Sequence, residues 1–497
     1  MLRKLRITLA LLVFGCITLL FLDVTGTLHG WLGWLAKIQF LPAVMALNAG
    51  VIVLLVALTL LLGRVYCSVI CPLGVMQDFM ARLGRQFPKR RKLPYNYSPA
   101  LTRLRGGVVV LFVAAQLLGW SAWAALIAPY SAYGRIANNL FRPLWEWGNN
   151  ALAALAERMD SYAFYATEVW LKSLPVLIVA GVTFIVLFIL AGRNGRTYCN
   201  TICPVGTILG FLSRFALFRV AFDQEKCVKC SLCARQCKAS CIDYKNHSID
   251  YSRCVACMNC LATCKHGALA YRLRPWLSRP AGEQAASGGE TRRGFLTVAA
   301  LFMYGLWGKA QDKKVDGGLA IIADKQPPAR HAAITPPGSM GMQHFTSHCT
   351  ACQLCVSACP NEVLRPSGDM AHFMQPEMSY ERGYCRPECT KCAEVCPAGA
   401  IHLKDLADKS SIQIGHAVWV KKNCIPLTDR ETCGNCARHC PAGAIQMVSS
   451  VPGDEESLRI PVVNTERCIG CGACENLCPA RPFSAIYVEG HVRHRII

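Results

Sequence analysis

Four long apolar runs dominate the first half of the chain, at residues 7–22, 41–63, 106–129 and 174–192. A helix needs about 20 apolar residues to cross a hydrocarbon core of roughly 30 Å. The second and third runs meet this length, the fourth is close to it, and the first is short but uninterrupted by charge. The pattern therefore predicts a membrane unit of four α-helical spans.

Charged residues between the runs predict how this unit is oriented. The segment 64–105 carries nine Lys and Arg residues against one acid, Asp78, whereas the segment 130–173 balances four basic against four acidic residues. Basic residues also precede the first run and follow the fourth. Because loops rich in Lys and Arg stay in the cytoplasm, both ends of the unit are expected on the cytoplasmic face.

Composition narrows the class of protein. With 53% hydrophobic and 17% charged residues, a chain of 497 residues is a poor fit for a soluble protein with one core. The formal charge of +22 does not indicate nucleic-acid binding, because the basic residues stand beside apolar runs rather than among aromatics. The thirty cysteines stand mostly at C-x-x-C spacings, which suit metal ligation better than a disulfide framework.

Two similar cysteine motifs follow apolar runs: "YCSVICPLG" begins at Tyr66 and "YCNTICPVG" begins at Tyr198. Each comes after a span, so the two read as an internal repeat whose halves could meet across a pseudo-twofold axis. Four thiolates would then form one site for an iron–sulfur cluster, copper(I) or zinc. Alternatively, each pair is a local dithiol or marks a helix start, since Pro suits the first helical turn. The cysteines of this predicted site are Cys67, Cys71, Cys199 and Cys203.

The next cysteines follow the bacterial ferredoxin pattern C-x2-C-x2-C-x3-C twice, and in this pattern the fourth cysteine ligates the other cluster. The predicted ligands of one cluster are Cys227, Cys230, Cys233 and Cys264. Those of the second are Cys254, Cys257, Cys260 and Cys237. Lys238 and Lys265 stand where such proteins usually have Pro, which removes no ligand.

Four further motifs end in C-x3-C-P and imply four more clusters, paired either as neighbours or first with fourth. Their cysteines are Cys349, Cys352, Cys355, Cys359; Cys385, Cys389, Cys392, Cys396; Cys424, Cys433, Cys436, Cys440; and Cys468, Cys471, Cys474, Cys478. Zinc is disfavoured because six runs end in C-x3-C. Cys16 and Cys241 are left over and are read as a small core residue and a spare thiol. So many clusters that each carry one electron, in a chain without a nucleophile motif, indicate a protein that transfers electrons rather than one with a catalytic pocket.

A linker separates the two groups of ferredoxin motifs. Arg292 and Arg293 precede an apolar stretch at residues 295–308, which is too short for a full span but matches the apolar part of a twin-arginine export signal. The alternatives are a basic linker with a buried or interfacial helix, and a fifth, signal-anchor segment. If it is a signal, the residues after about 309 lie in the periplasm and the first ferredoxin unit stays in the cytoplasm.

The expected organisation is a four-span membrane domain (1–220), a cytoplasmic two-cluster ferredoxin domain (221–275), a linker with the signal-like segment (276–345) and a four-cluster polyferredoxin domain (346–497). The expected fold class is a membrane α-helical bundle with small α+β ferredoxin-like modules. Segments this short fold around their clusters because they bury too little apolar surface alone.

With these motifs in this order, the chain resembles two ferredoxin-type proteins joined end to end. Residues 1 to about 275 resemble the NapH and MauN membrane ferredoxins, and residues from about 288 onward resemble NapG and MauM, which usually are separate chains. The resemblance implies the electron-transfer subunit of a quinol dehydrogenase in the bacterial inner membrane. It would take electrons from the quinone pool through its clusters to a periplasmic oxidoreductase such as nitrate reductase or a cytochrome. The cysteine motifs account for six [4Fe-4S] clusters, with a seventh if the C-x-x-x-C-P cysteines hold one.

Quinol oxidation also needs groups that accept or orient protons at the membrane boundary. The candidates are Asp23, His29 and Glu168, with Arg105 as an orienting donor, although each could equally be an anchor or a solvated loop residue. The alternative functions are a maturation factor that supplies metal or electrons to another metalloenzyme, and a cytoplasmic polyferredoxin hub.

Overall fold

The computed structural model describes residues 2–23, 26–86, 95–161, 163–273, 328, 330–403, 405–454 and 456–497. They belong to one packing unit, which joins the chain up to Arg274 with the chain from Gln326 onward. Arg292, Arg293 and the apolar stretch 295–308 lie outside the described residues, so the export signal stays a prediction.

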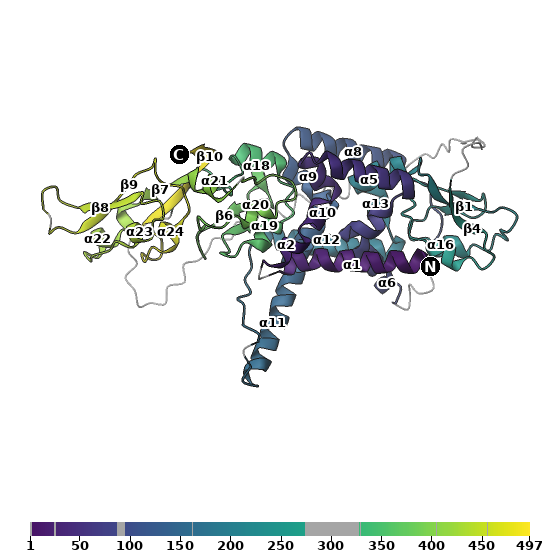
Figure 1. Cartoon of the computed structure of the whole chain (residues 1–497), viewed down its shortest axis with the longest axis horizontal. Helices are drawn as coiled ribbons and strands as arrows, with labels where there is room; N and C mark the ends of the chain where they lie inside the picture. Colours follow the sequence, from purple (N-terminus) through teal and green to yellow (C-terminus); the bar gives the residue numbers. More distant parts are fainter. Residues whose placement is uncertain are drawn as a thin grey trace, which may run out of the picture. The chain divides into compact units, whose positions relative to one another are not determined.

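Two of the four predicted spans are single long helices (Figure 1). Helix α1 covers Leu2–Leu22 and α12 covers Leu174–Asn194, and both are long and apolar enough to cross a membrane. The sequence explains both ends of α12, because Pro175 occupies its first turn and Gly195 ends it with a φ of 74°. By length and composition these two helices give weak support for membrane association.

The other two apolar runs differ from the prediction because the chain turns inside each of them. The run 41–63 forms α4 (Phe40–Met45) and α5 (Ala49–Leu62), separated at Leu47, which has a φ of 50°. The Asn48 side chain then accepts a hydrogen bond from the Val51 N–H and caps α5. The run 106–129 is similarly divided at Gly119, whose φ is 78°. The four-span bundle therefore stays a prediction.

The remaining helices of this region are short. They are α2 (Leu28–Leu32), α3 (Trp34–Lys37), α6 (Pro72–Gly84), α8 (Thr102–Leu117), α9 (Ser121–Ile127), α10 (Pro129–Ile136), α11 (Arg142–Glu157), α13 (Thr197–Thr201) and α14 (Pro204–Ser213), with one-turn π-helices η1 (Tyr66–Ile70) and η2 (Ala137–Phe141). The two cysteine motifs fold alike: η1 leads into α6 and α13 leads into α14. Cys71 and Cys203 are extended N-caps, each followed by a proline in the first turn.

The first ferredoxin module, residues 218–273, follows α14. Its elements are β1 (Phe218–Phe222), α15 (Leu232–Arg235), β2 (Ile242–Asp243), β3 (Ser248–Ile249), α16 (Asn259–Thr263) and β4 (Leu269–Leu273). Strand β1 pairs antiparallel with β4, and β2 with β3. The module contacts the C-terminal end of α5, where the Tyr271 hydroxyl donates to the Leu62 carbonyl oxygen at 3.0 Å.

The C-terminal module, residues 330–497, has three antiparallel strand pairs, β5 with β6, β7 with β10 and β8 with β9. Its helices are α18 (Met342–His348), α19 (Leu354–Ala358), α20 (Lys391–Glu394), α21 (Leu406–Ser411), α22 (Ile425–Thr428), α23 (Asn435–Arg438) and α24 (Ala473–Asn476), with 3-10 turns η3 (Met370–His372) and η4 (Lys421–Asn423). Its strands are β5 (Leu364–Pro366), β6 (Pro376–Met378), β7 (Ile412–Trp419), β8 (Ile445–Ser449), β9 (Arg459–Val463) and β10 (Ile486–Ile496).

The two modules contact opposite ends of α12. Val176, near the start of α12, packs in one apolar cluster with Ala351 and Met374 of the C-terminal module. Past the other end of the helix, the Arg196 N–H donates to the Lys238 carbonyl oxygen of the first ferredoxin module at 2.8 Å. The 21 residues of α12 span roughly 31 Å, which separates these two contacts by about the thickness of a bilayer core.

Candidate iron–sulfur sites

The cysteines of the internal repeat lie together and buried. Cys67, Cys71, Cys199 and Cys203 are each less than 5% exposed. Burial raises the pKa of Cys203, and the neighbouring thiols Cys199, Cys67 and Cys71 raise it further. The structure thus brings all four thiols into one set, called the repeat site below. The two C-x-x-x-C-P motifs therefore lie next to each other in the structure, as the internal repeat suggests.

Two buried arginines cross between the halves of the repeat. Each stands three residues before the first cysteine of its own motif and donates to the backbone of the other motif. Arg64 Nη2 donates to the Cys199 carbonyl oxygen at 3.1 Å and lies 3.7 Å from Cys67 Sγ. Arg196 Nη1 donates to the Cys67 carbonyl oxygen at 2.6 Å and lies 3.9 Å from Cys199 Sγ. These positive charges favour thiolates at the repeat site.

Two glycines make this crossing sterically feasible. A Cβ atom on Gly74 would lie 2.2 Å from the Cys67 carbonyl oxygen and 2.8 Å from Arg196 Nη1. A Cβ atom on Gly206 would lie 2.2 Å from the Cys199 carbonyl oxygen and 2.9 Å from Arg64 Nη2. Only glycine therefore fits the third position after the second cysteine in each half.

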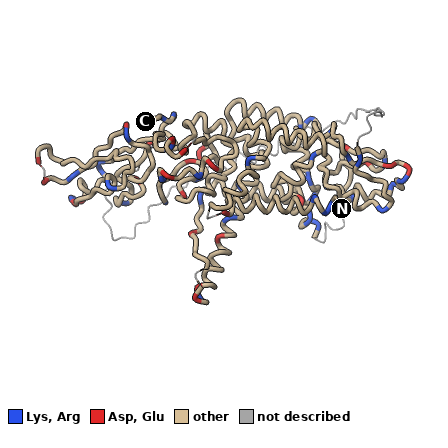
Figure 2. Tube along the Cα trace, in the orientation of Figure 1, with Lys and Arg blue, Asp and Glu red and all other residues tan. Residues whose placement is uncertain are grey.

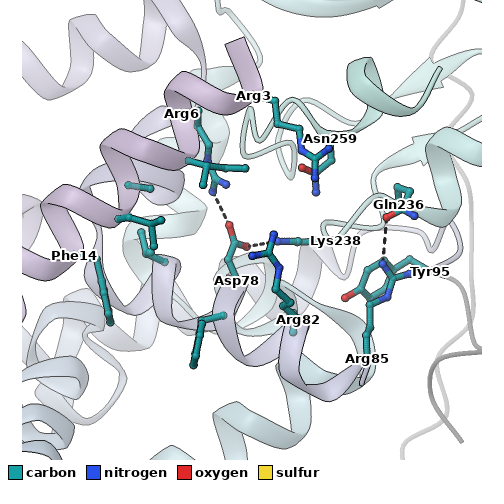
Figure 3. A pocket seen from close by; sticks show the side chains of 16 residues that line it. Arg3, Arg6, Phe14, Asp78, Arg82, Arg85, Tyr95, Gln236, Lys238 and Asn259 are labelled. Atoms are coloured by element: carbon teal, nitrogen blue, oxygen red, sulfur yellow. Dashed lines mark hydrogen bonds and ion pairs between the residues drawn. The ribbon is translucent and has the colours of Figure 1, made fainter. Parts of the chain in front are cut away.

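Asp78 of α6 distinguishes the first half of the repeat. Its carboxylate contacts Arg6 Nη2 at 2.5 Å and Lys238 Nζ at 3.4 Å (Figure 3), and it also contacts Arg196 Nε at 2.8 Å. Burial opposes ionisation, but these cations outweigh burial and hold the pKa of Asp78 well below its usual range. Asp78 joins α1, the repeat site and the first ferredoxin module. As the single acid in the basic segment 64–105, it offered a sequence signal that we did not use.

The first ferredoxin module holds the two predicted sets of thiols. The four cysteines of the first set line one small pocket: Cys227, Cys230, Cys233 and Cys264. In the second set, burial raises the pKa of Cys260, and the nearby thiols raise it further, which places Cys260 with Cys257, Cys254 and Cys237. Each of the two motifs in this module therefore contributes its fourth cysteine to the set formed by the first three cysteines of the other motif.

Cys241 has a more definite place than the spare thiol expected from the sequence. It is buried, and its Sγ lies 3.5 Å from Cys237 Sγ. Hydrogen bonds with Cys237 and Cys254 raise the pKa of Cys241 well above its usual range. Cys16 is half-buried on α1 and packs against the apolar core, as expected.

The C-terminal module settles how its cysteines gather, which the sequence left open. Neighbouring motifs exchange their fourth cysteine. Burial raises the pKa of the Cys349, Cys355, Cys385, Cys392, Cys436, Cys471 and Cys474 thiols, and the neighbouring thiols that raise it further identify four sets: Cys349, Cys352, Cys355 with Cys396; Cys385, Cys389, Cys392 with Cys359; Cys424, Cys433, Cys436 with Cys478; and Cys468, Cys471, Cys474 with Cys440. The nested arrangement of first with fourth motif does not occur.

The backbone around these thiols fits a four-iron cluster. In four motifs the residues on either side of the second cysteine have positive φ: Lys229 and Ser231, Ala256 and Met258, Ala351 and Gln353, Gly470 and Gly472. Backbone folded in this way forms a concave nest of N–H groups that suits an anionic cluster. Backbone N–H groups also donate to sulfur, for example from Ala351 to Cys349 Sγ at 3.4 Å. Among the described residues, no three His, Cys, Asp or Glu groups form a site for a single metal ion.

The residues proposed from the sequence for quinol deprotonation do not meet at one place. The Asp23 carboxylate pairs with His29 Nδ1 at 3.0 Å, so these two are partners of each other. Glu168 is exposed and pairs with an arginine of the C-terminal module at 2.7 Å. Arg105 donates to Ser252 Oγ at 2.9 Å and attaches the first ferredoxin module. Position near a span end did not predict these tertiary partners.

Known protein families match the chain in the regions that contain these thiols. A 4Fe-4S binding domain family matches residues 45–91 and 174–222, which contain the two halves of the repeat site. A second 4Fe-4S binding domain family matches residues 342–365, and a 4Fe-4S dicluster domain family matches residues 430–481. The chain thus has several 4Fe-4S binding domains, which confirms the ferredoxin-like part of the expected fold class.

Several curated ferredoxin-type proteins are similar to part of the chain. The methylamine utilization ferredoxin-type protein MauM of Methylophilus methylotrophus is 30% identical over 192 residues, which is 38% of this chain and 79% of MauM. MauM of Methylorubrum extorquens is 34% identical over 168 residues, 32% of this chain and 76% of that protein. The ferredoxin-type protein NapF of Escherichia coli is 31% identical over 160 residues, 32% of this chain and 87% of NapF. No solved structure matches the chain. The chain therefore belongs to the family of ferredoxin-type iron–sulfur proteins represented by MauM and NapF.

Proposed function

We propose that the protein is a membrane-bound quinol dehydrogenase subunit that passes electrons through seven [4Fe-4S] clusters to a periplasmic oxidoreductase or cytochrome. Such clusters are one-electron carriers, held by the thiol sets described above. One observation carries the proposal: buried side chains link the repeat site directly to the first ferredoxin module and, through α10 and η2 in the same apolar core, to the C-terminal module. The residues of the chain therefore connect all seven sets.

On the side of the first ferredoxin module, Arg64 makes the connection. Its guanidinium lies 3.7 Å from Cys67 Sγ and donates to the Ser252 carbonyl oxygen at 3.0 Å. Ser252 is two residues before Cys254, which belongs to the second thiol set of that module. One buried side chain thus contacts both the repeat site and the loop of the next set.

On the side of the C-terminal module, α10 and η2 make the connection. Ser131 Oγ donates to the Thr350 carbonyl oxygen at 2.5 Å, and Asn139 Nδ2 donates to Gln353 Oε1 at 3.0 Å. A Cβ atom on Gly134 would lie 2.2 Å from the Cys352 carbonyl oxygen, so the helix backbone touches the cysteine loop itself. These contacts hold the first C-terminal thiol set against the helical region.

Within the C-terminal module, the sets continue from one pair of motifs to the other. The Cys385 N–H donates to the Cys471 carbonyl oxygen at 2.9 Å, which joins the second set to the fourth. Tyr380 is buried at this junction, and its hydroxyl donates to the Gly470 carbonyl oxygen at 2.6 Å. The set that includes Cys424 is then the last of the thiol sets in this order. Electrons would leave from it to a redox partner.

The proposed topology is supported by charge and by packing. Figure 2 shows Lys and Arg gathered near the start of α1, around α6 and in the first ferredoxin module. The basic segment 64–105 and the first module belong to the same end of α12, and the C-terminal module contacts the other end. This arrangement supports the proposal that the first module is cytoplasmic and the C-terminal module periplasmic.

The test is anaerobic iron and sulfide analysis of the full chain, with electron paramagnetic resonance before and after quinol addition. Four-iron cubes in seven sets require about 28 irons, and the double variant Cys67→Ser, Cys199→Ser should retain about 24. Quinol should reduce a signal in the wild type and not in the double variant. Cys16→Ser is the matched control, because Cys16 lies on α1 outside the thiol sets, and it should keep the wild-type iron content.

An unchanged iron content in the double variant, with no reduction by quinol in either protein, would contradict the proposal. The repeat site would then hold another metal or act as a dithiol. The protein would be better described as a maturation factor that supplies metal or electrons to a metalloenzyme.

A further inference from the structure

A cavity of about 370 Å³ lies between α1, α6 and the first ferredoxin module (Figure 3). Small-molecule sites usually have volumes of about 300–1,000 Å³. One wall is apolar and comes from both helices, with Ala10, Leu11 and Phe14 on α1 and Val75 and Phe79 on α6. Because Leu11 and Phe79 are 61% and 60% exposed, this wall continues onto the surface that would face lipid.

The other end of the cavity is polar and positively charged. Asp78 lies there with Arg6 and Lys238, and Arg3, Arg82 and Arg85 also line the cavity. Five cations therefore line this end of the cavity, and two of them, Arg6 and Lys238, pair with the one carboxylate. Such an end suits a ligand group that presents oxygen atoms and gains negative charge during reaction.

The polar end is adjacent to two of the thiol sets. Asp78 contacts Arg196, whose Nη1 lies 3.9 Å from Cys199 Sγ of the repeat site. Lys238 and Asn259, which line the cavity, directly follow Cys237 and precede Cys260 in the chain. An oxidisable ring at this end would therefore lie next to two one-electron acceptors.

We propose that this cavity is the quinol site, with the ring at Asp78, Arg6 and Lys238 and the isoprenoid tail along α1 and α6. The inference rests on the proposed function. Oxidation of one quinol breaks two O–H bonds and releases two electrons and two protons. Clusters held by the two adjacent thiol sets would supply the one-electron acceptors for these electrons, and the protons leave to water at the exposed rim that includes Arg3 and Arg82.

The second half of the repeat lacks the carboxylate that stands at the polar end of this cavity. Asp78 is seven residues after Cys71, and the seventh residue after Cys203 is Gly210. The next position is phenylalanine in both halves, Phe79 and Phe211, with 60% and 59% exposure. Phe211 does not line the cavity, so it is a matched control for Phe79.

The experiment uses the full chain in detergent with two pairs of variants. Leu11→Trp should obstruct the cavity, whereas Leu12→Trp alters a residue of similar exposure, 59%, outside it. Phe79→Ala removes an aromatic wall that Phe211→Ala leaves intact. We expect Leu11→Trp and Phe79→Ala to raise the KM for a soluble quinol about tenfold, and both controls to keep the wild-type KM. Iron content and reduction by dithionite should be unchanged in all four.

A second readout does not depend on turnover. A photoreactive azidoquinone should label residues of α1 and α6 in the wild type, as mapped by mass spectrometry, and the labelling should be lost in Leu11→Trp and retained in Leu12→Trp. Labelling elsewhere, with wild-type KM in every variant, would overturn the site and leave the proposed function standing. Displacement of the label by phosphatidylglycerol with wild-type KM in every variant would instead assign the cavity to lipid and overturn the inference. A wild-type protein that dithionite reduces but quinol does not would refute both.

Discussion

The two halves of the internal repeat share an arginine, a tyrosine, a proline and a glycine at matching positions but give their arginines different partners. Arg196 pairs with the carboxylate of Asp78 at 2.8 Å. Arg64, at the same position of the other half, donates instead to the neutral groups Asn200 Oδ1 and the Ser252 carbonyl oxygen at 2.9 and 3.0 Å. The backbone of the repeat is symmetric, whereas its charge is not.

This difference shows how a duplicated site can acquire two roles. In the Arg64 half, the guanidinium donates hydrogen bonds to neutral acceptors and so attaches the first ferredoxin module. The Arg196 half carries a network of one carboxylate and three cations that forms the polar end of a cavity. Mutations can therefore test separately the backbone contacts that both halves share and the charged contacts that only the Arg196 half makes.

The largest effect is expected at the two glycines that the symmetric backbone requires. Gly74→Ala and Gly206→Ala each place a Cβ atom 2.2 Å from a backbone carbonyl oxygen, which cannot move aside as a side chain would. Each should destabilise the helical region by about 3 kcal/mol or more, at the upper end of overpacking effects. Denaturant titration followed by cluster absorbance measures this loss.

Gly181→Ala on α12 is the control for these variants, because no atom lies within 4 Å of a Cβ added there. It should leave stability unchanged or slightly raised. If only one of Gly74→Ala and Gly206→Ala proves destabilising, the backbone symmetry of the repeat does not hold.

The second effect tests the asymmetry of charge. Arg196→Met removes one of three cations from a largely buried carboxylate, which should cost about 3 kcal/mol. Arg64→Met leaves neutral acceptors without a hydrogen-bond donor, and this should lower the free energy of unfolding by about 2 kcal/mol. Adding Asp78→Asn to Arg196→Met should cost less than the sum of the single changes, with a coupling of about 1–3 kcal/mol. Additive costs would show that the Asp78 contact contributes nothing to stability.

The sequence predicted the thiol sets better than their surroundings. Cysteine spacing located the motifs, and the internal repeat and the bacterial ferredoxin pattern then predicted how the sets of the repeat and of the first ferredoxin module combine. They did not predict the pairing in the C-terminal module, because Cys359 and Cys396 could have joined any partner that folding brought near. Whether Cys241 is near other thiols likewise depends on how its loop folds against Cys237.

Helix continuity and the polar residues were predicted less well, also for physical reasons. Hydropathy does not detect a turn at Leu47 or Gly119 inside an apolar run, because the turn depends on φ rather than polarity. Asp78 stands in a basic segment, and only its tertiary contacts with Arg6 and Lys238 give it a role. Glu168 stood out in the sequence, yet it is exposed and pairs with the C-terminal module.

The smallest effect concerns the tyrosine that precedes each first cysteine. The Tyr66 hydroxyl has two buried partners, accepting from the Phe40 N–H at 3.0 Å and donating to Gln39 Oε1 at 3.1 Å. The Tyr198 hydroxyl has one, the Ile127 carbonyl oxygen at 2.6 Å. Tyr66→Phe should therefore cost about 2 kcal/mol and Tyr198→Phe about 1 kcal/mol, in proportion to the groups left without a partner.

The exposed Tyr165→Phe should change stability by less than about 0.5 kcal/mol in the same denaturant titration. Equal costs for Tyr66→Phe and Tyr198→Phe would mean that the number of partners does not decide the difference. A larger cost for Tyr198→Phe would indicate that its contact with Ile127, just before the helix that touches the Cys352 loop, also holds the C-terminal module in place. The asymmetry of the repeat would then extend to its tyrosines, with one half bound to each ferredoxin module.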